Sequence, residues 1–410
     1  MRRALMAALL TSSLAVTALM AAPAQASQGG PVTPTDFGMH VPTIAQGTDP
    51  SVSYGTVRLW DAGVAWGQVE QKNNKYWWNG MDAAVANANA QNAKILYVLG
   101  STPKWAASNK KQGTYPNKGA ASMPSMKEWK AWVTAVTKRY GSSIESYQIW
   151  NEANLTTFWQ GTPKQMADLT KAAYTIIRKY DPTAKVVAAS STVRLQSAYK
   201  KFFPAYLKEL KKQKWPIDVV SVHLYPASTG TPANRADYIA QVQKDMKKAK
   251  VPASKELWDT EINYGIAGPG SGNPDRNIEG PTAAAWVAQT YLDNIRLGID
   301  RAYWYYWYPS ANLVGIQMYD GTVGSIGYQT VNTWLDGAFY SCTSGTVNTC
   351  QLGDNTNPKV IAWASTGQGT FVVPAGATQT CDALNQCSPV TPGTPVTIGS
   401  MPQWFGLTPS

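Results

Sequence analysis

Residues 147–154, with the sequence Tyr-Gln-Ile-Trp-Asn-Glu-Ala-Asn, place an acid and an amide at the end of a short β-prone run. Asn151 and Glu152 follow this run directly, ahead of a loop that contains Phe158 and Trp159. A carboxylic acid there can protonate a leaving oxygen, the amide can bind a ring hydroxyl, and an indole face can stack on a sugar ring. A solvated glutamate after an ordinary strand explains the stretch alone equally well.

A second acid, Glu261, ends another strand-like run at 256–264. Side chains alternate along a strand, so Asp259 is expected on the same face, one layer deeper. If the two strands are parallel and close a barrel, Glu152 and Glu261 face one another across its mouth. The alternative is that Glu261 only pairs with a neighbouring arginine.

Other strand ends carry side chains that suit a supporting role. Arg58 can hold Glu261 ionised through a charge-assisted hydrogen bond, and Tyr225, which shares a strand face with His223, can donate a second one. Trp307, on the same face as Tyr305, would form an aromatic floor for a sugar. The candidate binding residues are therefore Arg58, Asn151, His223, Tyr225, Trp307, Trp159, Trp60 and His40. Packing is the simpler explanation for His40, and for Trp60 and Trp159 each taken alone.

The elements that would position these residues alternate between strands and helices. Eight mostly apolar stretches are predicted as strands, and most are followed by a helical pattern: 36–41, 55–61, 93–100, 146–152, 185–191, 218–225, 256–264 and 301–308. Near-continuous apolar strands are typical of parallel sheets that are covered on both faces. The pattern predicts a (β/α)₈ TIM barrel. The rival is a doubly wound open sheet, but no glycine-rich phosphate loop follows the first strands.

The chain divides into three parts. Residues 1–26 have a charged start, an apolar run and a final Ala-Gln-Ala, which predicts a cleaved signal peptide and hence secretion; a membrane anchor is the alternative. The barrel is expected over 27–342, with no later membrane span. Short strands separated by Gly, Pro and Thr predict a small all-β domain over 343–410. An exported chain with four cysteines is expected to form two disulfides, and we favour the local pairs Cys342–Cys350 and Cys381–Cys387.

The chain is basic, with 36 Lys and Arg against 25 Asp and Glu. Much of the excess lies in helix-like lysine runs near 208–214 and 244–250, which indicates solvated helix faces. A weak attraction to an acidic or cell-surface glycan remains open. Nucleic acid is not expected as a partner, because the basic runs carry few aromatic residues and no recognised binding motif. No metal and no cofactor are expected, and a monomer is the predicted state.

The strand-end residues together resemble the clan A glycoside hydrolases: Asn151-Glu152, His223-x-Tyr225, Glu261 and an aromatic end to the last strand. The run from Asn151 to Trp159, together with Thr102-Pro103-Lys104-Trp105, most resembles family 39, and the C-terminal β-rich region fits that family. Ala153 departs from the pattern, because clan members usually have proline after the Asn-Glu pair.

The resemblance implies a retaining double displacement. Glu152 would act as general acid and then as base, Glu261 as nucleophile, and Asn151 would bind the hydroxyl next to the anomeric carbon. Retention requires the two carboxyl groups to lie about 5–5.5 Å apart, whereas about 6.5–9.5 Å indicates inversion. The ionised Glu261 is expected to raise the pKa of Glu152. A transglycosylase with the same residues, a non-catalytic glycan-binding barrel and a structural protein of the cell envelope are the alternatives.

Overall fold

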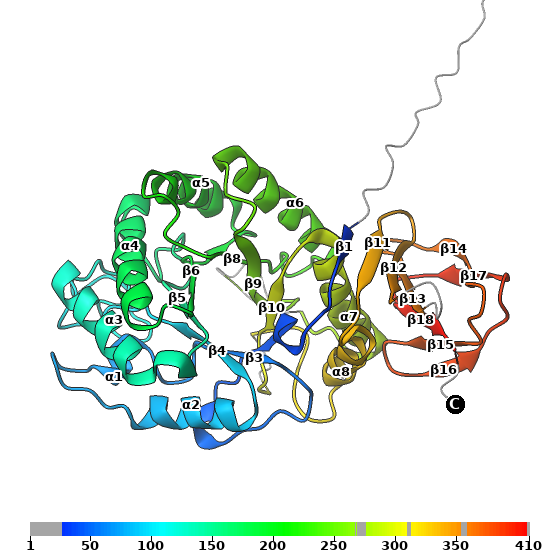
Figure 1. The fold of residues 1–410 in the computed structure, drawn as a ribbon, viewed down its shortest axis with the longest axis horizontal. Coiled ribbons are helices and arrows are strands. Elements are labelled where there is room, and N and C mark those ends of the chain that lie inside the picture. The colour runs from blue at the N-terminus through cyan, green and yellow to red at the C-terminus, as the bar shows by residue number, and fades with distance from the viewer. Residues whose placement is uncertain (1–26, 267, 269–275, 310–312, 354–358, 408–410) are drawn as a thin grey trace, which may run out of the picture.

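The computed structural model describes residues 27–266, 268, 276–309, 313–353 and 359–407. The predicted signal segment 1–26 lies outside them. Figure 1 shows a ring of strands surrounded by helices, with a separate β-structure at the C-terminal end of the chain beside α7 and α8. Within the described residues, no helix is both long enough and apolar enough to cross a membrane.

The ring is a closed parallel barrel, which confirms the predicted fold. Its strands pair in the order β6-β5-β4-β3-β2-β10-β9-β8-β7, and a further pairing of β6 with β8 closes it. The fifth barrel strand is split into two short pieces, β6 and β7. The strand bounds are β2 Phe37–Met39, β3 Thr56–Leu59, β4 Lys94–Val98, β5 Ser146–Gln148, β6 Lys185–Val187, β7 Ser191–Thr192, β8 Val219–His223, β9 Glu256–Ile262 and β10 Arg301–Trp304.

Helices cover the outside of the barrel. Their bounds are α1 Trp66–Val69, α2 Asn79–Ala90, α3 Met126–Tyr140, α4 Pro163–Tyr180, α5 Gln196–Lys212, α6 Pro232–Ala249, α7 Gly280–Leu297 and α8 Val323–Leu335. Three 3₁₀ turns accompany them: η1 Pro34–Asp36, η2 Ile44–Gln46 and η3 Gly141–Ser143. A 3₁₀ turn, η2, follows β2 where the other strands are followed by α-helices.

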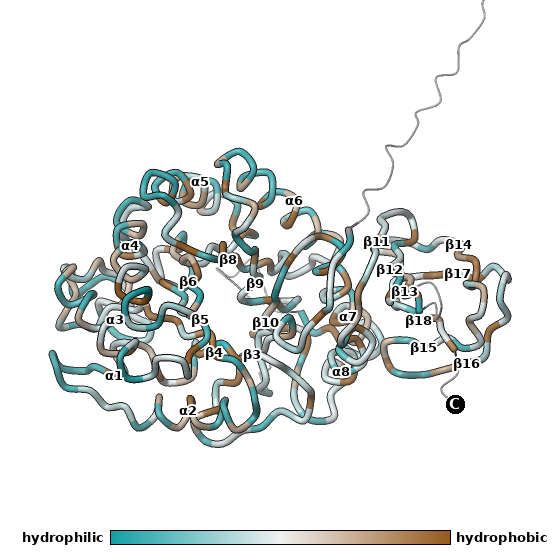
Figure 2. Tube along the Cα trace, in the orientation of Figure 1, coloured by the Kyte–Doolittle hydropathy of each residue, from teal (hydrophilic) through white to brown (hydrophobic). Residues whose placement is uncertain are grey.

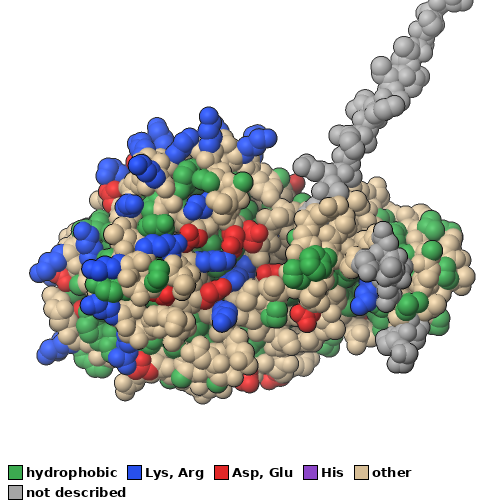
Figure 3. Space-filling model, in the orientation of Figure 1, with side chains coloured by type: hydrophobic (Ala, Val, Ile, Leu, Met, Phe, Trp, Pro, Cys, Tyr) green, Lys and Arg blue, Asp and Glu red, His purple; other side chains and the backbone are tan. Residues whose placement is uncertain are grey.

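Hydrophilic residues line the outer sides of the helices. Figure 2 shows them along α5 and on the outer turns of α6. Figure 3 shows Lys and Arg side chains gathered over the same part of the surface. Lys208, Lys212, Lys244 and Lys248 are all exposed. The lysine runs are therefore solvated helix faces, as the sequence predicts.

The barrel interior is apolar in its lower layer and polar above. Five fully buried side chains from five strands form the apolar layer: Leu96, Val187, Val219, Trp258 and Tyr303. Arg58 pairs across strands with Leu96 and Gln148 with Val187, and Ser221 follows Val219 by two positions; these three polar side chains are also fully buried. Buried polar groups of this kind are stable only when they are hydrogen-bonded, so this layer must form a network.

The register of β9 shifts near Thr260, because Asp259 pairs with Val222 while Glu261 pairs with the next residue of β8, His223. An irregularity of this kind breaks the alternation of side chains along a strand. Simple alternation predicts that Asp259 lies beneath Glu261 on the same face of the strand. The register shift places it on the other face. Its carboxylate instead points outward and accepts a hydrogen bond from Arg235 of α6 at 2.8 Å.

The C-terminal region is all-β, as predicted. A seven-stranded sheet has the order β1-β11-β12-β13-β18-β15-β16, and β14 and β17 form a separate pair. The bounds are β1 Ser27–Gly29, β11 Tyr340–Thr343, β12 Asn348–Leu352, β13 Lys359–Trp363, β14 Gly369–Val372, β15 Gln379–Asp382, β16 Cys387–Pro389, β17 Pro395–Ile398 and β18 Gln403–Gly406. The sheet begins at Tyr340, shortly before the boundary expected at 343. It also takes in β1, from the other end of the chain.

Two disulfides each cross-link the two strands of a β-hairpin in this region. Cys342 of β11 is bonded to Cys350 of β12, and Cys381 of β15 is bonded to Cys387 of β16. In both cases the bonded residues are directly opposite one another in antiparallel strands. The local pairing that the sequence favours is confirmed.

Candidate active site

A cavity of about 690 Å³ opens at the mouth of the barrel, at the C-terminal ends of the strands. Five of the residues predicted from sequence line it: Trp60, Asn151, Glu152, Tyr225 and Glu261. Active sites of this fold collect at that end of the barrel, because the loops after the strands form its rim.

Glu152 is positioned by a short loop after β5. Its backbone has φ = +39°, a conformation that residues other than glycine rarely adopt and that often marks a functional site. Its backbone N–H donates to the Ser190 hydroxyl at 2.9 Å. The Asn154 side chain binds the backbone of Thr192 twice, at 3.0 Å each. Asn154 therefore fixes the loop that carries the acid.

Glu261 is held through both of its carboxylate oxygens. Arg58 donates to Oε1 at 2.5 Å, and the Tyr225 hydroxyl donates to Oε2 at 3.0 Å. The structure thus places both supporting residues where the sequence predicts them. Glu261 is in addition only 6% exposed. A guanidinium and a phenol that donate to the same carboxylate favour its ionised form.

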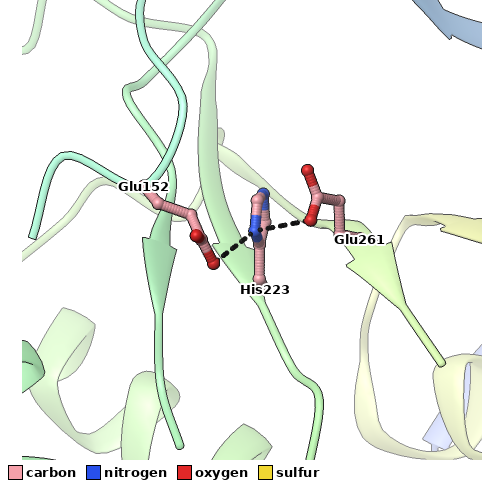
Figure 4. A group of neighbouring side chains, drawn as sticks. All are labelled: Glu152, His223 and Glu261. Atoms are coloured by element: carbon pink, nitrogen blue, oxygen red, sulfur yellow. Dashed lines mark hydrogen bonds and ion pairs between the residues drawn. The ribbon is translucent and has the colours of Figure 1, made fainter. Parts of the chain in front are cut away.

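His223 lies between the two acids (Figure 4). Its Nδ1 is 3.1 Å from a Glu152 oxygen and 3.3 Å from a Glu261 oxygen. One oxygen of each glutamate and this nitrogen all lie within 4.8 Å of one another. An ionised Glu261 carboxylate can only accept a hydrogen bond, so we assign the imidazole proton to Nδ1. Burial lowers the pKa of His223 to about 3, so the ring is neutral near pH 7.

Beneath the acids, Arg58 connects several strands through hydrogen bonds. Its Nη2 donates to Asn151 Oδ1 at 2.7 Å, and its Nε donates to Gln148 Oε1 at 2.8 Å. Because Arg58 binds the amide oxygen of Asn151, the NH₂ group points the other way, and no hydrogen bond from it to a described residue is present. His40 is fully buried, and its Nε2 donates to the Thr260 carbonyl oxygen at 3.0 Å. His40 therefore supports the Glu261 strand and does not line the cavity.

Burial sets the protonation of Glu152. It raises the pKa of this carboxyl to about 7, although Arg194, Arg58 and the Thr192 hydroxyl favour the charged form. The sequence predicts the raised pKa but attributes it to the charge on Glu261, whereas burial is the main cause. Burial also raises the pKa of Glu261, and the positive charge of Arg58 opposes that shift.

Asp61 is a third acid in the cavity and is not among the site residues predicted from the sequence. The Tyr305 hydroxyl donates to Asp61 Oδ2 at 2.8 Å, and the Tyr115 hydroxyl donates to Oδ1. Its position at the end of a predicted strand, 55–61, was the available signal. Arg194 also lines the cavity and was missed, because it follows a strand that is split in two.

The aromatic side chains divide into two groups. Trp60 lines the cavity and meets Tyr115 and Phe158 edge to face. Trp159 is buried against Trp150 and borders a different cavity.

Trp307 is buried and does not line the cavity, in contrast to the expected aromatic floor. Because β10 ends at Trp304, side-chain alternation does not extend to residue 307. Tyr305, Tyr306 and Tyr308 line this side of the cavity instead.

The atoms of Glu152, His223 and Glu261 that face one another have a spacing that metal ligands can also have. Arg58 already places a permanent positive charge 2.5 Å from Glu261. A cation between the glutamates would meet this charge at close range, which disfavours metal binding. The arrangement suits proton transfer and nucleophilic attack by two carboxyl groups.

Solved structures share this fold at low sequence identity. One is a family 39 glycoside hydrolase from the gut symbiont Bacteroides cellulosilyticus WH2, which is 17% identical with a TM-score of 0.68 over 92% of this chain and 82% of that one. A GH39 β-xylosidase from Caulobacter crescentus is 15% identical, with a TM-score of 0.68 over 94% and 98% of the two chains. The GH39 enzyme from Xanthomonas axonopodis pv. citri is 15% identical, with a TM-score of 0.64 over 97% and 100%.

The comparison with curated proteins gives no match. The family model described as glycosyl hydrolases family 39 matches residues 68–308, which is more than half of the chain and includes Glu152, His223, Tyr225 and Glu261. These structures and this match confirm the resemblance that the sequence suggests. The chain belongs to glycosyl hydrolases family 39, within clan A, and is a glycosidase.

Proposed function

We propose that the enzyme hydrolyses a polysaccharide or oligosaccharide with retention of anomeric configuration. The observation that carries the proposal is the approach of one Glu152 oxygen to within 4.8 Å of one Glu261 oxygen. Retaining glycosidases have carboxyl groups about 5–5.5 Å apart, whereas inverting enzymes need room for a water molecule between the catalytic base and the sugar.

The reaction has two steps. In the first, Glu261 attacks the anomeric carbon while Glu152 donates its proton to the departing oxygen, which gives a covalent glycosyl-enzyme and a free leaving-group alcohol. In the second, Glu152 takes a proton from water, the hydroxide oxygen bonds to the anomeric carbon, and Glu261 is released as a carboxylate. The protonated Glu152 and the Arg58-bound Glu261 suit these roles.

The neighbouring residues bind the substrate and hold the acids in position. Asn151 donates its amide NH₂ to the hydroxyl next to the anomeric carbon, and Trp60 offers a ring face in the cavity. Tyr225 and His223 position the carboxylates through hydrogen bonds. His40, Trp159 and Trp307 were candidates for substrate contact, and their burial supports roles in packing.

We further propose that the protein is secreted and acts as a monomer on an extracellular glycan. Two disulfides are typical of proteins in oxidising compartments, and the apolar segment before Ser27 has the pattern of a signal peptide. A solved relative from Caulobacter crescentus CB15 is described as a monomeric β-xylosidase. The basic surface favours an acidic or cell-surface glycan.

The test is chemical rescue of the nucleophile, after a screen of polysaccharides has identified a substrate. Glu261→Ala is expected to lower turnover by more than about 10³-fold, because losing a nucleophile costs more than losing one stabilising donor. Added azide should restore part of the activity and give a glycosyl azide of inverted configuration.

Glu256→Ala is the matched control. Glu256 lies at the other end of the same strand, where it pairs with Lys185, so this variant should keep its turnover. Wild-type turnover by Glu261→Ala without azide would remove Glu261 from the mechanism.

A further inference from the structure

Arg194 lines two cavities at once. It follows β7 and precedes α5, and it contributes to the wall of the catalytic cavity. It also lines a second cavity of about 990 Å³, between the loop after β5 and the start of α5. Polar groups such as Gln160, Gln196 and Lys201 line that second cavity. The two cavities therefore meet at Arg194, which forms part of the wall of each.

Arg194 differs from the other arginine of the catalytic centre. Arg58 forms an ion pair with Glu261, whereas Arg194 makes no ion pair with any described residue. Its Nη1 donates to the carbonyl oxygen of Gly268 at 2.6 Å, which fixes the guanidinium. Its Nε is buried and has no partner among the described residues. A buried donor without a partner is costly, so the site favours a ligand that supplies an acceptor.

The barrel topology places Arg194 on one side of the two catalytic acids. The strand order puts Glu152 after β5 and Glu261 on β9, with β6, β7 and β8 between them on one side and β10, β2, β3 and β4 on the other. Trp60, which the proposed mechanism assigns to substrate binding, follows β3 on the second side, as does Asp61, so we place the reacting sugar there. The leaving group must then lie on the first side, where Arg194 is.

The opposite side of the cavity carries a fixed acid. Asp61 follows β3, and its oxygens accept hydrogen bonds from Tyr115 and Tyr305. A carboxylate that already accepts from two phenols can accept further hydroxyls but repels an anion. The cavity is therefore electrostatically asymmetric, with a cation on the leaving-group side and an acid beyond the reacting sugar.

We propose that Arg194 selects a glycan whose leaving-group sugar carries an anionic substituent, bound by its guanidinium at the junction of the two cavities. The chemistry that Arg194 recognises is a planar or tetrahedral oxyanion, as in a uronate carboxylate, a sulfate ester or a phosphate ester. The reacting sugar, next to Asp61, is neutral. This inference rests on the proposed function for the direction of the leaving group.

The first test measures binding, so that it does not depend on hydrolysis. In a Glu152→Gln background, the probes are polygalacturonate and its carboxyl-reduced form, carrageenan and its desulfated form, and phosphomannan and its dephosphorylated form. At least one anionic polymer is expected to bind more tightly than its neutral partner. Arg194→Gln should weaken that binding roughly tenfold to a hundredfold, the value of a hydrogen bond to a charged group, and leave the neutral polymer unaffected.

Two further variants show whether the loss of binding in Arg194→Gln comes from a specific contact, from the change in net charge or from misfolding. Lys244→Gln removes the same charge from an exposed position on α6, and it should leave the dissociation constant unchanged at 0.15 M salt. Arg194→Lys keeps the charge and should recover part of the binding. Equal losses in Arg194→Gln and Lys244→Gln would overturn the inference, as would failure to bind any of the three anionic polymers.

The second test examines the products of any glycan that the wild-type enzyme cleaves. The leaving-group sugar becomes the new non-reducing end of one fragment, and mass spectrometry of that fragment should locate the anionic group there. Cleavage only of neutral glycans, with no effect of Arg194→Gln, would contradict the inference while leaving the hydrolase intact. Arg194-dependent binding without cleavage of any glycan would instead contradict the proposed hydrolysis.

Discussion

Glu152 and Glu261 are the same type of residue, but their surroundings at the barrel mouth differ. Glu261 accepts from a guanidinium and a phenol, which stabilise a negative charge on it. Glu152 contacts the neutral imidazole of His223, and burial raises its pKa to about 7 although Arg194 and Arg58 favour the charged form. When the surroundings of two carboxyl groups differ in this way, their pKa values differ too, and one site can then contain both a proton donor and an ionised nucleophile.

The pH dependence of the reaction follows from Glu152. The acid must be protonated, so kcat/KM is expected to fall as the pH rises through about 7. Arg194 favours the charged form of Glu152, so Arg194→Gln should move this alkaline limb to higher pH. A pH–rate profile of both proteins measures the shift. An alkaline limb near the ordinary glutamate pKa of about 4.3 would show that burial does not control the acid.

At the scale of elements, the sequence predicted the strands that carry the acids, because their apolar runs end in polar residues. It also placed Arg58 and Tyr225 correctly, since both lie on regular strands. It failed where a strand is irregular. The register shift near Thr260 turns Asp259 toward the helices, and the end of β10 at Trp304 breaks the alternation on which Trp307 was assigned. Backbone irregularities of this kind leave no trace in a pattern of polar and apolar residues.

The outward position of Asp259 has a measurable consequence. Its ion pair with Arg235 is completely buried, with side chains 1% and 0% exposed. Arg235→Met would leave the acid buried without its partner, which is expected to lower the free energy of unfolding by about 3–5 kcal/mol. Arg235→Met combined with Asp259→Leu should recover most of this loss, as urea denaturation can show. Stability unchanged in the single variant would refute the pairing.

At the scale of the whole molecule, the C-terminal sheet packs beside the barrel and not over its mouth. Helix α7 contacts β1 and β11, and no described residue of the sheet lines the catalytic cavity. The sequence predicted an all-β region and its local disulfides from composition and cysteine spacing. It could not predict that β1 joins the same sheet, because that pairing links residues more than 300 positions apart along the chain.

Because the C-terminal sheet lies away from the catalytic cavity, a substitution in the sheet is expected to lower stability without lowering turnover. Replacing Cys342 and Cys350 by serine removes a bridge with a sequence separation of 8. The loop entropy of such a bridge is worth about 2–3 kcal/mol, so the midpoint of thermal unfolding should fall. Turnover below that midpoint should stay within about twofold of the wild type, since surface changes away from a site act mainly on stability. A specific loss of kcat in the folded variant would place the sheet in the active site.

The most direct test of the central claim is the configuration of the first sugar released. NMR of a fresh digest, recorded before the anomers equilibrate, reports whether the new reducing end keeps the configuration of the bond that was cut. The close approach of Glu152 and Glu261 predicts retention. Release of the inverted anomer would show that water, and not Glu261, attacks the anomeric carbon.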